Sequence, residues 1–364
     1  MPIILTNQTT SSRGGIQRYV VRLARELSRS RGRVVIVEPT ALDEAEGTDG
    51  IIYRRFRAGG RLGELLNGFF AYMRCVLAER GDFTLASIWF PSGLIAAVLP
   101  RFLRGPLAIT VHGTEVAPER GGIRRALLRY TLRRADAVFA VSTFVQGLVA
   151  KVEPRANVVL IHSGVDVVGA HGVRASRPTL LSVGRLVARK GFDRTIEALP
   201  EILSALPDAV YEIVGDGPQR SELEELVARL KLTDSVRFLG AVDDDALRAA
   251  YARAWCFALP CRRIGSDVEG FGLVYLEAAV AGLPSIGGRY SGAEDAIVHE
   301  ETGLLVDGND AAAIAAAAIR LLGDPAYAAR LGTRGAQRAE ADFSWAETGR
   351  KVTETMTKLS AARA

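Results

Sequence analysis

Cysteine, histidine and long apolar runs are scarce in this chain of 364 residues, which has only 3 Cys and 4 His. The cysteines, Cys75, Cys256 and Cys261, are odd in number and lack metal-site spacing, so no disulfide framework is expected. No apolar run approaches the roughly 18 residues of a membrane-spanning helix, and the first residues turn polar too soon for a signal peptide. We therefore expect a cytoplasmic protein whose cysteines are packing residues.

Clusters of metal ligands and a complete dinucleotide fingerprint are also missing. Asp243, Asp244 and Asp245 could be mistaken for a metal-binding motif, but a helical pattern follows them, and helix capping explains them better. Gly215 and Gly217 begin like a nicotinamide-binding fingerprint, but position 220, where a third glycine is required, is Arg. We therefore expect no catalytic metal, and a nicotinamide-dependent oxidoreductase is disfavoured.

The charge is unevenly distributed along a chain whose apolar content of 48% suits about two domains. Residues 1–170 hold 23 Lys and Arg against 14 Asp and Glu, a balance of +9, whereas the remainder holds 23 against 27, a balance of −4. The N-terminal half is therefore expected to meet an acidic partner.

Two segments of this half read as basic amphipathic helices. The first has arginines before an apolar pattern, namely Arg54, Arg55, Arg57 and Arg61, then Leu62, Leu65, Leu66, Phe69, Phe70, Met73 and Leu77. In the second, apolar residues lie among arginines, namely Ile123, Leu127 and Tyr130 among Arg120, Arg124, Arg125, Arg129, Arg133 and Arg134. An anionic membrane surface is the favoured partner, and the open alternative is a core-facing stripe with a solvated arginine face. Nucleic acid is not expected, because no helix-turn-helix, zinc or aromatic stacking motif accompanies the charge.

Apolar runs alternate with amphipathic segments twice over, which predicts an α/β protein with two doubly wound parallel sheets. The strands are expected at residues 3–5, 34–37, 85–89, 107–111, 137–141 and 158–161, then at 179–183, 209–214, 236–239, 255–258, 284–286 and 303–306. A linker is expected over 167–178, where Gly and Pro interrupt the pattern, and a closing helix over 345–359.

The segment from Glu269 to Glu277 places two carboxylates around a glycine-rich turn that opens a helix. Gly270 and Gly272 allow tight backbone conformations, and the free amides at the helix start attract an anion. Glu269 and Glu277 can each accept hydrogen bonds from hydroxyls on either side of that anion. A nucleotide sugar fits this arrangement. A capped helix with one solvated and one ion-paired glutamate is the open alternative.

This segment resembles the Glu-x7-Glu signature of the retaining glycosyltransferases of family 4, and its wider form, from Asp267 to Ala278, is similar to bacterial mannosyltransferases that act on phosphatidylinositol mannosides. The resemblance covers nearly the whole chain. It implies the GT-B fold, two doubly wound Rossmann-like domains facing across a deep cleft. Residues 1–168 would form the acceptor-side domain, with the C-terminal helix 345–364 packing back on it, and 169–344 the nucleotide-sugar domain.

The resemblance also implies roles for individual residues of the second domain. Glu269 would contact sugar hydroxyls, Glu277 the ribose, and the backbone of Gly270, Phe271, Gly272 and Leu273 the diphosphate. The Gly-Arg-x4-Lys-Gly pattern from Gly184 to Gly191 matches the family's diphosphate-binding motif. It would make Arg185 and Lys190 the cations that stabilise the leaving group.

In the first domain the resemblance points to two loops. Gly14 and Gly15, at the start of a helix, would touch the donor diphosphate or the acceptor, and Arg13 is an acceptor-side candidate. His112 would contact the sugar at its reaction face, with Glu115 as a second acceptor-side candidate. A flexible connector and a structural histidine are the plainer interpretations of these loops.

The expected reaction is transfer of a hexosyl group, best mannose from GDP-mannose, with retention to a hydroxyl of a lipid-linked or cell-envelope saccharide. The donor is a substrate, no cofactor or metal is expected, and the protein would lie at the inner face of the cytoplasmic membrane. A transferase that uses UDP-glucose or UDP-N-acetylglucosamine is the first alternative. A nicotinamide-dependent oxidoreductase and a non-catalytic sugar-nucleotide or lipid-binding protein are more remote.

Overall fold

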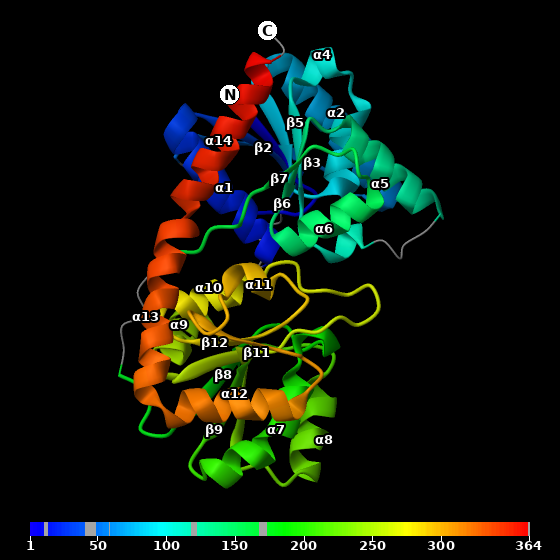
Figure 1. Cartoon of the computed structure of the whole chain (residues 1–364). Helices are drawn as coiled ribbons and strands as arrows, with labels where there is room; N and C mark the ends of the chain where they lie inside the picture. Colours follow the sequence, from blue (N-terminus) through cyan, green and yellow to red (C-terminus); the bar gives the residue numbers. More distant parts are fainter. Residues whose placement is uncertain (11–13, 41–48, 58, 118–121, 167–172, 363–364) are drawn as a thin grey trace. The chain divides into compact units, whose positions relative to one another are not determined.

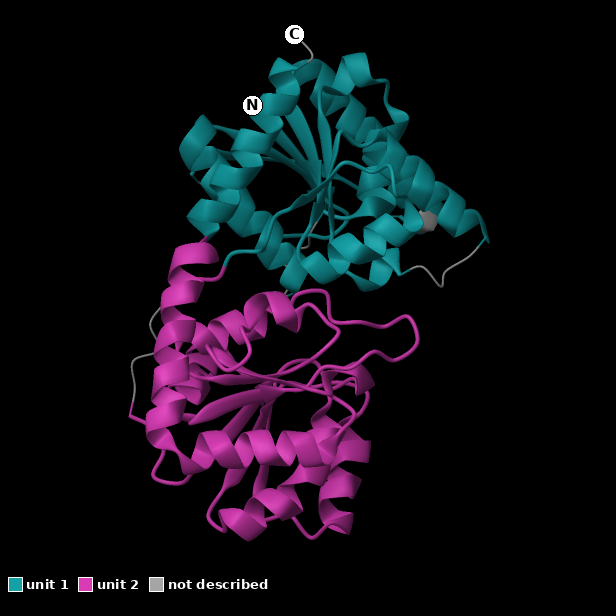
Figure 2. Ribbon diagram, in the orientation of Figure 1, with its two compact units in different colours: residues 1–164, 345–364 teal, residues 165–344 magenta. Residues whose placement is uncertain are grey.

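The computed structural model describes residues 1–10, 14–40, 49–57, 59–117, 122–166 and 173–362, which divide into two compact units. Unit 1 comprises Met1–Gly164 together with Trp345–Ala364, and unit 2 comprises Val165–Ser344 (Figure 2). Residues 167–172 of the expected linker lie outside the described residues.

In the described residues of unit 1, seven parallel strands form one sheet with the order β3-β2-β1-β4-β5-β6-β7 (Figure 1). The strands are β1 Pro2–Leu5, β2 Val34–Pro39, β3 Ile51–Phe56, β4 Phe83–Ala86, β5 Leu107–Val111, β6 Ala137–Ala140 and β7 Val158–Leu160. The helices are α1 Gly15–Arg31, α2 Arg61–Glu79, α3 Leu94–Val98, α4 Arg101–Arg104, α5 Gly122–Arg134, α6 Thr143–Val152 and α14 Trp345–Ala361, with short turns η1 Trp89–Gly93 and η2 Thr114–Val116.

The described part of unit 2 has a second parallel sheet of six strands, ordered β10-β9-β8-β11-β12-β13. Its strands are β8 Thr179–Val183, β9 Val210–Val214, β10 Val236–Gly240, β11 Cys256–Leu259, β12 Ser285–Gly288 and β13 Gly303–Val306. Its helices are α7 Phe192–Ala205, α8 Arg220–Arg229, α9 Asp244–Arg253, α10 Leu273–Val280, α11 Ala293–Ala296, α12 Ala311–Gly323 and α13 Pro325–Asp342, with the 3₁₀ turn η3 Ala188–Lys190. The predicted α/β class with two doubly wound sheets is confirmed.

Two strand predictions for unit 1 were wrong. Strand β3 was missed because only its end residues, Ile51 and Phe56, are buried, while Arg54 and Arg55 were assigned to the basic segment that precedes the next helix. Those charges are tolerated because β3 is an edge strand and they pair with Glu79 and Glu38, with N–O distances of 2.6 and 3.4 Å. The strand expected at 85–89 instead spans Phe83–Ala86, since the chain turns into η1 at Trp89.

The C-terminal helix α14 completes the core of unit 1, where it packs beside α1 (Figure 1). Trp345, Val352 and Met356 of α14 belong to the same buried cluster as Tyr19 and Leu23 of α1. The ring centroids of Tyr19 and Trp345 lie 5.9 Å apart. Because the cluster contains side chains from both ends of the chain, unit 1 needs its C-terminal segment for a complete core.

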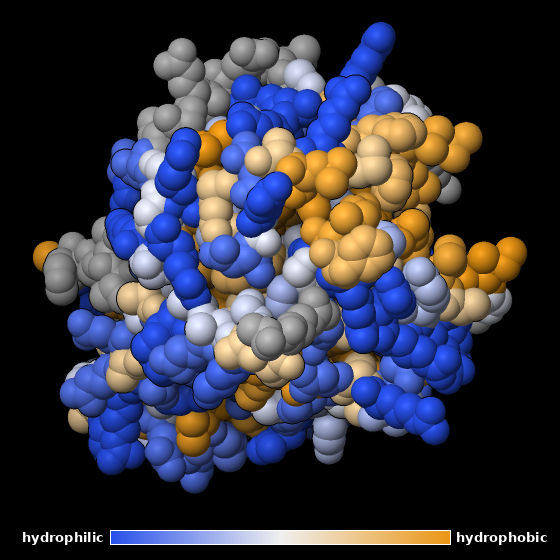
Figure 3. Space-filling model, turned by 90° about the horizontal axis from the view of Figure 1, so that it is seen from above, coloured by the Kyte–Doolittle hydropathy of each residue, from blue (hydrophilic) through white to orange (hydrophobic). Residues whose placement is uncertain are grey.

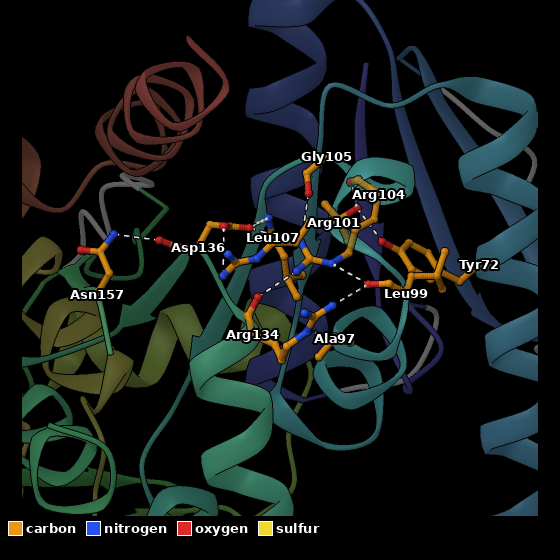
Figure 4. A network of polar contacts seen from close by, with 11 residues as sticks. Tyr72, Ala97, Leu99, Arg101, Arg104, Gly105, Leu107, Arg134, Asp136 and Asn157 are labelled. Carbon is orange, nitrogen blue, oxygen red and sulfur yellow. Dashed lines mark hydrogen bonds and ion pairs between the residues drawn. The ribbon is translucent and has the colours of Figure 1, made fainter. Parts of the chain in front are cut away.

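The buried guanidinium of Arg104 lies at the N-terminal ends of strands β5 and β6 in the unit 1 sheet (Figure 4). The Arg104 side chain is fully buried and donates to the carbonyls of Leu99, Gly105 and Arg134 at 2.8 to 3.3 Å. Its Nη1 also lies 3.2 Å from Oδ2 of Asp136, and the same carboxylate oxygen accepts from the amide of Leu107 at 2.8 Å. A buried charge is stable only when paired and hydrogen-bonded, so this network fixes α4 against both strands.

Candidate active site

The site in unit 2 lies where two neighbouring strands end. The Gly184–Gly191 segment follows β8, and the loop from Cys261 to Gly272 follows β11, which pairs with β8. Adjacent parallel strands end at the same edge of a sheet, and ligands of open α/β sheets bind at that edge. Two motifs about 80 residues apart in the sequence are therefore brought together by the sheet.

Glu269 is the centre of this arrangement. Its Oε2 lies 2.7 Å from the ammonium of Lys190 and 2.6 Å from Nη1 of Arg189. The thiol of Cys261 is a third, weaker donor to the same oxygen at 3.7 Å. Within the part of the chain that the structure describes, Oε1 of Glu269 has no hydrogen-bond partner. One carboxylate oxygen is thus held by the protein, and the other can accept a further hydrogen bond.

The surroundings of Glu269 also decide its ionisation. Burial favours the neutral acid, but the cations of Lys190 and Arg189 outweigh it, so the pKa of Glu269 lies below its ordinary value. Burial raises the pKa of the Cys261 thiol to about 12, and the Glu269 charge adds to that effect. Glu269 is therefore an acceptor-only carboxylate at neutral pH, and Cys261 is a neutral thiol that donates rather than a nucleophile.

The predicted glycine-rich turn takes the conformation that its sequence suggests. Gly272 has φ 81°, in the left-handed region, and precedes α10 as its N-cap without a side-chain cap. A Cβ at this position would lie 2.5 Å from the ring of Tyr275, which packs beneath the turn. The amides of Leu273 and Val274, at the start of α10, have no intrahelical acceptor and form an anion-attracting end, whereas the amide of Tyr275 donates to the carbonyl of Gly272 at 3.0 Å. The side chain of Phe271 is buried against Phe343, at 5.8 Å between centroids, so only its backbone can serve a ligand.

Glu277 lies in α10, as the spacing predicted. Its Oε2 accepts from the hydroxyl of Tyr251, a residue of α9, at 3.0 Å. Glu277 is the second glutamate of the Glu-x7-Glu pattern and is half-buried. The Tyr251 hydroxyl orients one oxygen of its carboxylate.

Arg185 differs from the other cations of the segment. It is exposed, and among the described residues it has no hydrogen bond or ion pair. Lys190, in contrast, is only 10% exposed and lies against Glu269. An extended guanidinium without an internal partner is free to follow a phosphate group, whereas Lys190 is a fixed charge.

The expected residues of unit 1 lie in two places. Gly14 and Gly15 are exposed at the start of α1, with Gly14 as its N-cap, and Arg13 lies outside the described residues. His112 follows β5, and its Nε2 lies 2.8 Å from the carbonyl oxygen of Ser87. Since that oxygen can only accept, Nε2 carries a proton, and a neutral ring presents Nδ1 as an acceptor.

Glu115 has a local partner that bears on its expected role. Its Oε1 accepts a hydrogen bond from the backbone amide of His112, and its carbonyl accepts from Nε1 of Trp89 at 2.9 Å. The carboxylate therefore fixes the turn that carries His112, which gives it a structural contact besides its predicted acceptor-side role.

Two residues of the site were not singled out from the sequence. Arg189 sits inside the Gly-Arg-x4-Lys-Gly pattern at a variable position, and Cys261 was interpreted as a packing residue only. Both are identified by their contact with Glu269 in the structure. No motif spacing in the sequence indicates these contacts.

Several arginines of α5 make ion pairs or hydrogen bonds within unit 1, which neither interpretation of this segment included. Arg129 and Arg133 both pair with the buried carboxylate of Glu153, at 3.2 and 2.7 Å, and Arg134 donates to the carbonyls of Ala97 and Leu99. These charges tie α5 to the rest of unit 1. Arg120 lies outside the described residues.

The first basic segment presents an apolar surface instead. Along α2, Leu62, Leu66, Phe70 and Leu77 are 50 to 70% exposed, and spacings of four, four and seven residues place them on one helical face. The core side of α2 is formed by other residues, chiefly Tyr72, Cys75 and Val76. Helix α4 packs beside α2 and exposes Phe102 and Leu103. We call these six exposed side chains the α2–α4 apolar surface; Figure 3 shows apolar residues gathered beside hydrophilic ones on one face.

Within the described ranges, no three His, Cys, Asp or Glu side chains gather as metal ligands. In the same ranges, no helix combines the length and apolar character needed to cross a membrane.

Comparison with known proteins decides the family. The protein-family model described as Glycosyltransferase Family 4 matches residues 13–168. A second family model, described as Glycosyl transferases group 1, matches residues 168–338. A GDP-mannose-dependent alpha-(1-6)-phosphatidylinositol monomannoside mannosyltransferase of Mycolicibacterium smegmatis is 32% identical over 389 residues, which cover 99% of each chain. The chain belongs to glycosyltransferase family 4. It is a nucleotide-sugar-dependent glycosyltransferase with the GT-B fold, so these predictions are confirmed.

Further similarities agree with this assignment. A GDP-mannose-dependent monoacylated alpha-(1-6)-phosphatidylinositol monomannoside mannosyltransferase of Corynebacterium glutamicum is 31% identical over 291 residues, covering 74% of this glycosyltransferase and 76% of that protein. Among solved structures, sucrose-phosphate synthase of Thermosynechococcus elongatus is similar with a TM-score of 0.85 and 26% identity, covering 99% of each chain.

Proposed function

We propose that this glycosyltransferase moves mannose from GDP-mannose to a hydroxyl of a lipid-linked or cell-envelope saccharide, with retention. The mannosyltransferases of M. smegmatis and C. glutamicum support the choice of donor and the kind of acceptor. The observation that carries the proposal is the Glu269 carboxylate, with one oxygen held by Lys190 and Arg189 and the other without a partner in the described residues.

The proposed roles follow from the charges of the site. The C1–O bond to the diphosphate breaks, and Arg185, Lys190 and the amides at the start of α10 stabilise the negative charge that develops on the leaving group. Oε1 of Glu269 accepts from a sugar hydroxyl, Glu277 from the ribose, and His112 contacts the sugar. The acceptor hydroxyl attacks from the face that the diphosphate leaves and gives its proton to the departing phosphate oxygen.

We propose further that this reaction needs no metal. Arg185 and Lys190, together with the amides at the start of α10, can stabilise the charge of a leaving nucleoside diphosphate, which is the role that Mg²⁺ plays elsewhere. Turnover should therefore continue in excess EDTA. A requirement for added Mg²⁺ or Mn²⁺ would contradict this part of the proposal.

The donor is tested by nucleotide release. GDP-mannose, UDP-glucose and UDP-N-acetylglucosamine are each supplied with and without a membrane lipid extract, and released nucleotide is measured. We expect release from GDP-mannose that rises with lipid. Release from a UDP-sugar alone would keep the enzyme class and replace the donor, whereas retention of reduced nicotinamide without any release would favour an oxidoreductase.

We also propose that the protein binds an anionic membrane surface through the α2–α4 apolar surface. Exposed apolar side chains beside cations such as Arg74 and Arg101 suit an acidic lipid interface. Burying one such side chain is worth about 1.5 to 3 kcal/mol, so the double substitution Leu66→Ser with Phe70→Ser should reduce vesicle binding by at least about tenfold.

The matched control is Val173→Ser, because Val173 is 91% exposed and lies in unit 2. Sedimentation is measured with vesicles of phosphatidylcholine alone and with phosphatidylglycerol added, at low and high salt. We expect binding only with the acidic lipid, weakened by salt, and no effect of the control. Equal binding to both vesicle types would contradict the proposal.

A further inference from the structure

Arg189 bridges two carboxylates of the loop that precedes α10. Its Nε donates to Oδ1 of Asp267 at 2.9 Å, and its Nη1 donates to Oε2 of Glu269 at 2.6 Å. The backbone around Arg189 is also tied to this loop, since its carbonyl accepts from the amide of Arg262 at 2.8 Å. A planar guanidinium held at two of its nitrogens has a fixed orientation, so it in turn fixes the carboxylate of Glu269.

The contact leaves a definite part of Glu269 available. Arg189, Lys190 and Cys261 all bind Oε2. Rotation of the carboxylate would break three contacts, so Oε1 keeps one direction. Precise direction matters at a reacting centre, where a displacement of about 1 Å can cost about 10²-fold in rate.

Arg189 also changes what Lys190 can do. If Lys190 alone faced Glu269, the pair would be neutral, and its ammonium would have little net attraction for a phosphate. With Arg189 present, two cations share the charge of Glu269, and Asp267 is the second partner of Arg189, so Lys190 is no longer the only counter-charge of the Glu269 carboxylate. The ammonium of Lys190 uses one of its three N–H donors on Glu269 and has two left for a phosphate oxygen.

The groups that face Glu269 come from three segments. Arg189 and Lys190 come from η3, and Cys261 comes from the loop after β11. Tyr275 of α10 reaches Glu269 through the Cys261 thiol, with its hydroxyl 3.4 Å from Sγ. Burial opposes ionisation of Glu269, and the two cations outweigh burial and hold its pKa low. Removing one cation should therefore raise that pKa.

We propose that Arg189 is a positioning residue for sugar transfer: it directs Oε1 of Glu269 and shares the charge of that carboxylate with Lys190, whose remaining N–H donors then serve the leaving diphosphate. The inference rests on the proposed function, because it names an additional requirement of the same site. A competing interpretation is that Arg189 has only a structural role and stabilises the loop from Cys261 to Gly272 in the folded protein.

The test compares Arg189→Met, Arg189→Lys and the wild type, with Arg320→Met as control. Arg320 pairs with Glu300 at 2.8 Å on the surface of the same unit, so the control removes an ion pair without touching the site. We expect Arg189→Met to lower kcat by about 10- to 100-fold, as for a misdirected group, while KM for the donor changes less than about threefold.

The pH profile separates the two interpretations. With Arg189→Met, the acid limb of kcat/KM should move to higher pH, because Glu269 must be ionised and loses a stabilising cation. Arg189→Lys should restore the acid limb but only part of kcat, since a single ammonium cannot bridge both carboxylates. If the role of Arg189 is only structural, Arg189→Met should lower the melting temperature and the amount of active enzyme without moving the acid limb of kcat/KM.

A second readout does not depend on turnover. The carboxyl resonance of Glu269, assigned by its loss in Glu269→Gln, is titrated by ¹³C NMR in the ligand-free wild type and in Arg189→Met. A higher pKa in the variant supports the inference, and an unchanged pKa overturns it. A wild type that releases no nucleotide would refute the proposed function, while this titration would still decide whether Arg189 controls Glu269.

Discussion

Replacing Arg185 with Ala should impair the reaction while leaving the fold intact. Arg185 is exposed and makes no interaction with other described residues, so the free energy of unfolding should change by less than about 0.5 kcal/mol. Losing one preorganised charge that stabilises a developing anion typically costs about 10²- to 10³-fold in kcat, which is about 2.7 to 4 kcal/mol of transition-state stabilisation. The expected effect on catalysis is thus several times the effect on stability.

The assay measures nucleotide release at saturating donor and acceptor, alongside urea unfolding of the same preparations. Arg229→Ala is the matched control, because Arg229 is an exposed arginine of unit 2 that also lacks a partner in the described residues. The control should keep wild-type kcat. A change in kcat below twofold for Arg185→Ala would remove Arg185 from the mechanism, and an equal loss in both variants would mean that surface charge in general is responsible.

Three further changes test the structure around the site and the core of unit 1. Arg104→Met should lower the free energy of unfolding by about 3 to 5 kcal/mol, because it leaves the carboxylate of Asp136 without its buried partner; urea unfolding measures this, and a loss below 1 kcal/mol would contradict the role given to the network. Glu269 has a lowered pKa, so its contribution to stability is present above its ordinary value of 4.5 and is lost as pH falls through the folded-state pKa. Stability should therefore fall more steeply below pH 4.5 in the wild type than in Glu269→Gln, and parallel curves would refute the assignment. Gly272→Ala should weaken donor binding by calorimetry, since its Cβ would meet the ring of Tyr275 at 2.5 Å in a left-handed conformation; unchanged affinity would mean that the turn does not hold the donor.

The parts of the fold that could be predicted from sequence are those with strong periodic or local signals. The buried parallel strands are continuous apolar runs, as at Leu107–Val111. The turn at Gly272 and the acidic N-cap Asp243, whose side chain accepts from the amide of Ala246 at 2.8 Å, follow from local backbone chemistry. Such features depend on a few neighbouring residues, so the sequence contains them directly.

The parts that could not be predicted depend on contacts between distant segments. Strand β3 carries Arg54 and Arg55, and nothing local reveals that Glu79 and Glu38 neutralise them. The ion pairs of the α5 arginines were not predicted, because their acceptors, such as Glu153, lie elsewhere in the chain. Arg189 was missed for the same reason, since its partners lie about 80 residues further on.

The measurement that tests the central claim most directly is the anomeric configuration of the product. GDP-mannose labelled with ¹³C at C1 is incubated with the enzyme, the lipid extract and excess EDTA, and the new glycoside is identified by NMR. We expect an α-mannoside, the configuration of the donor, formed without metal. A β-mannoside, or no transfer until a divalent cation is added, would contradict this expectation.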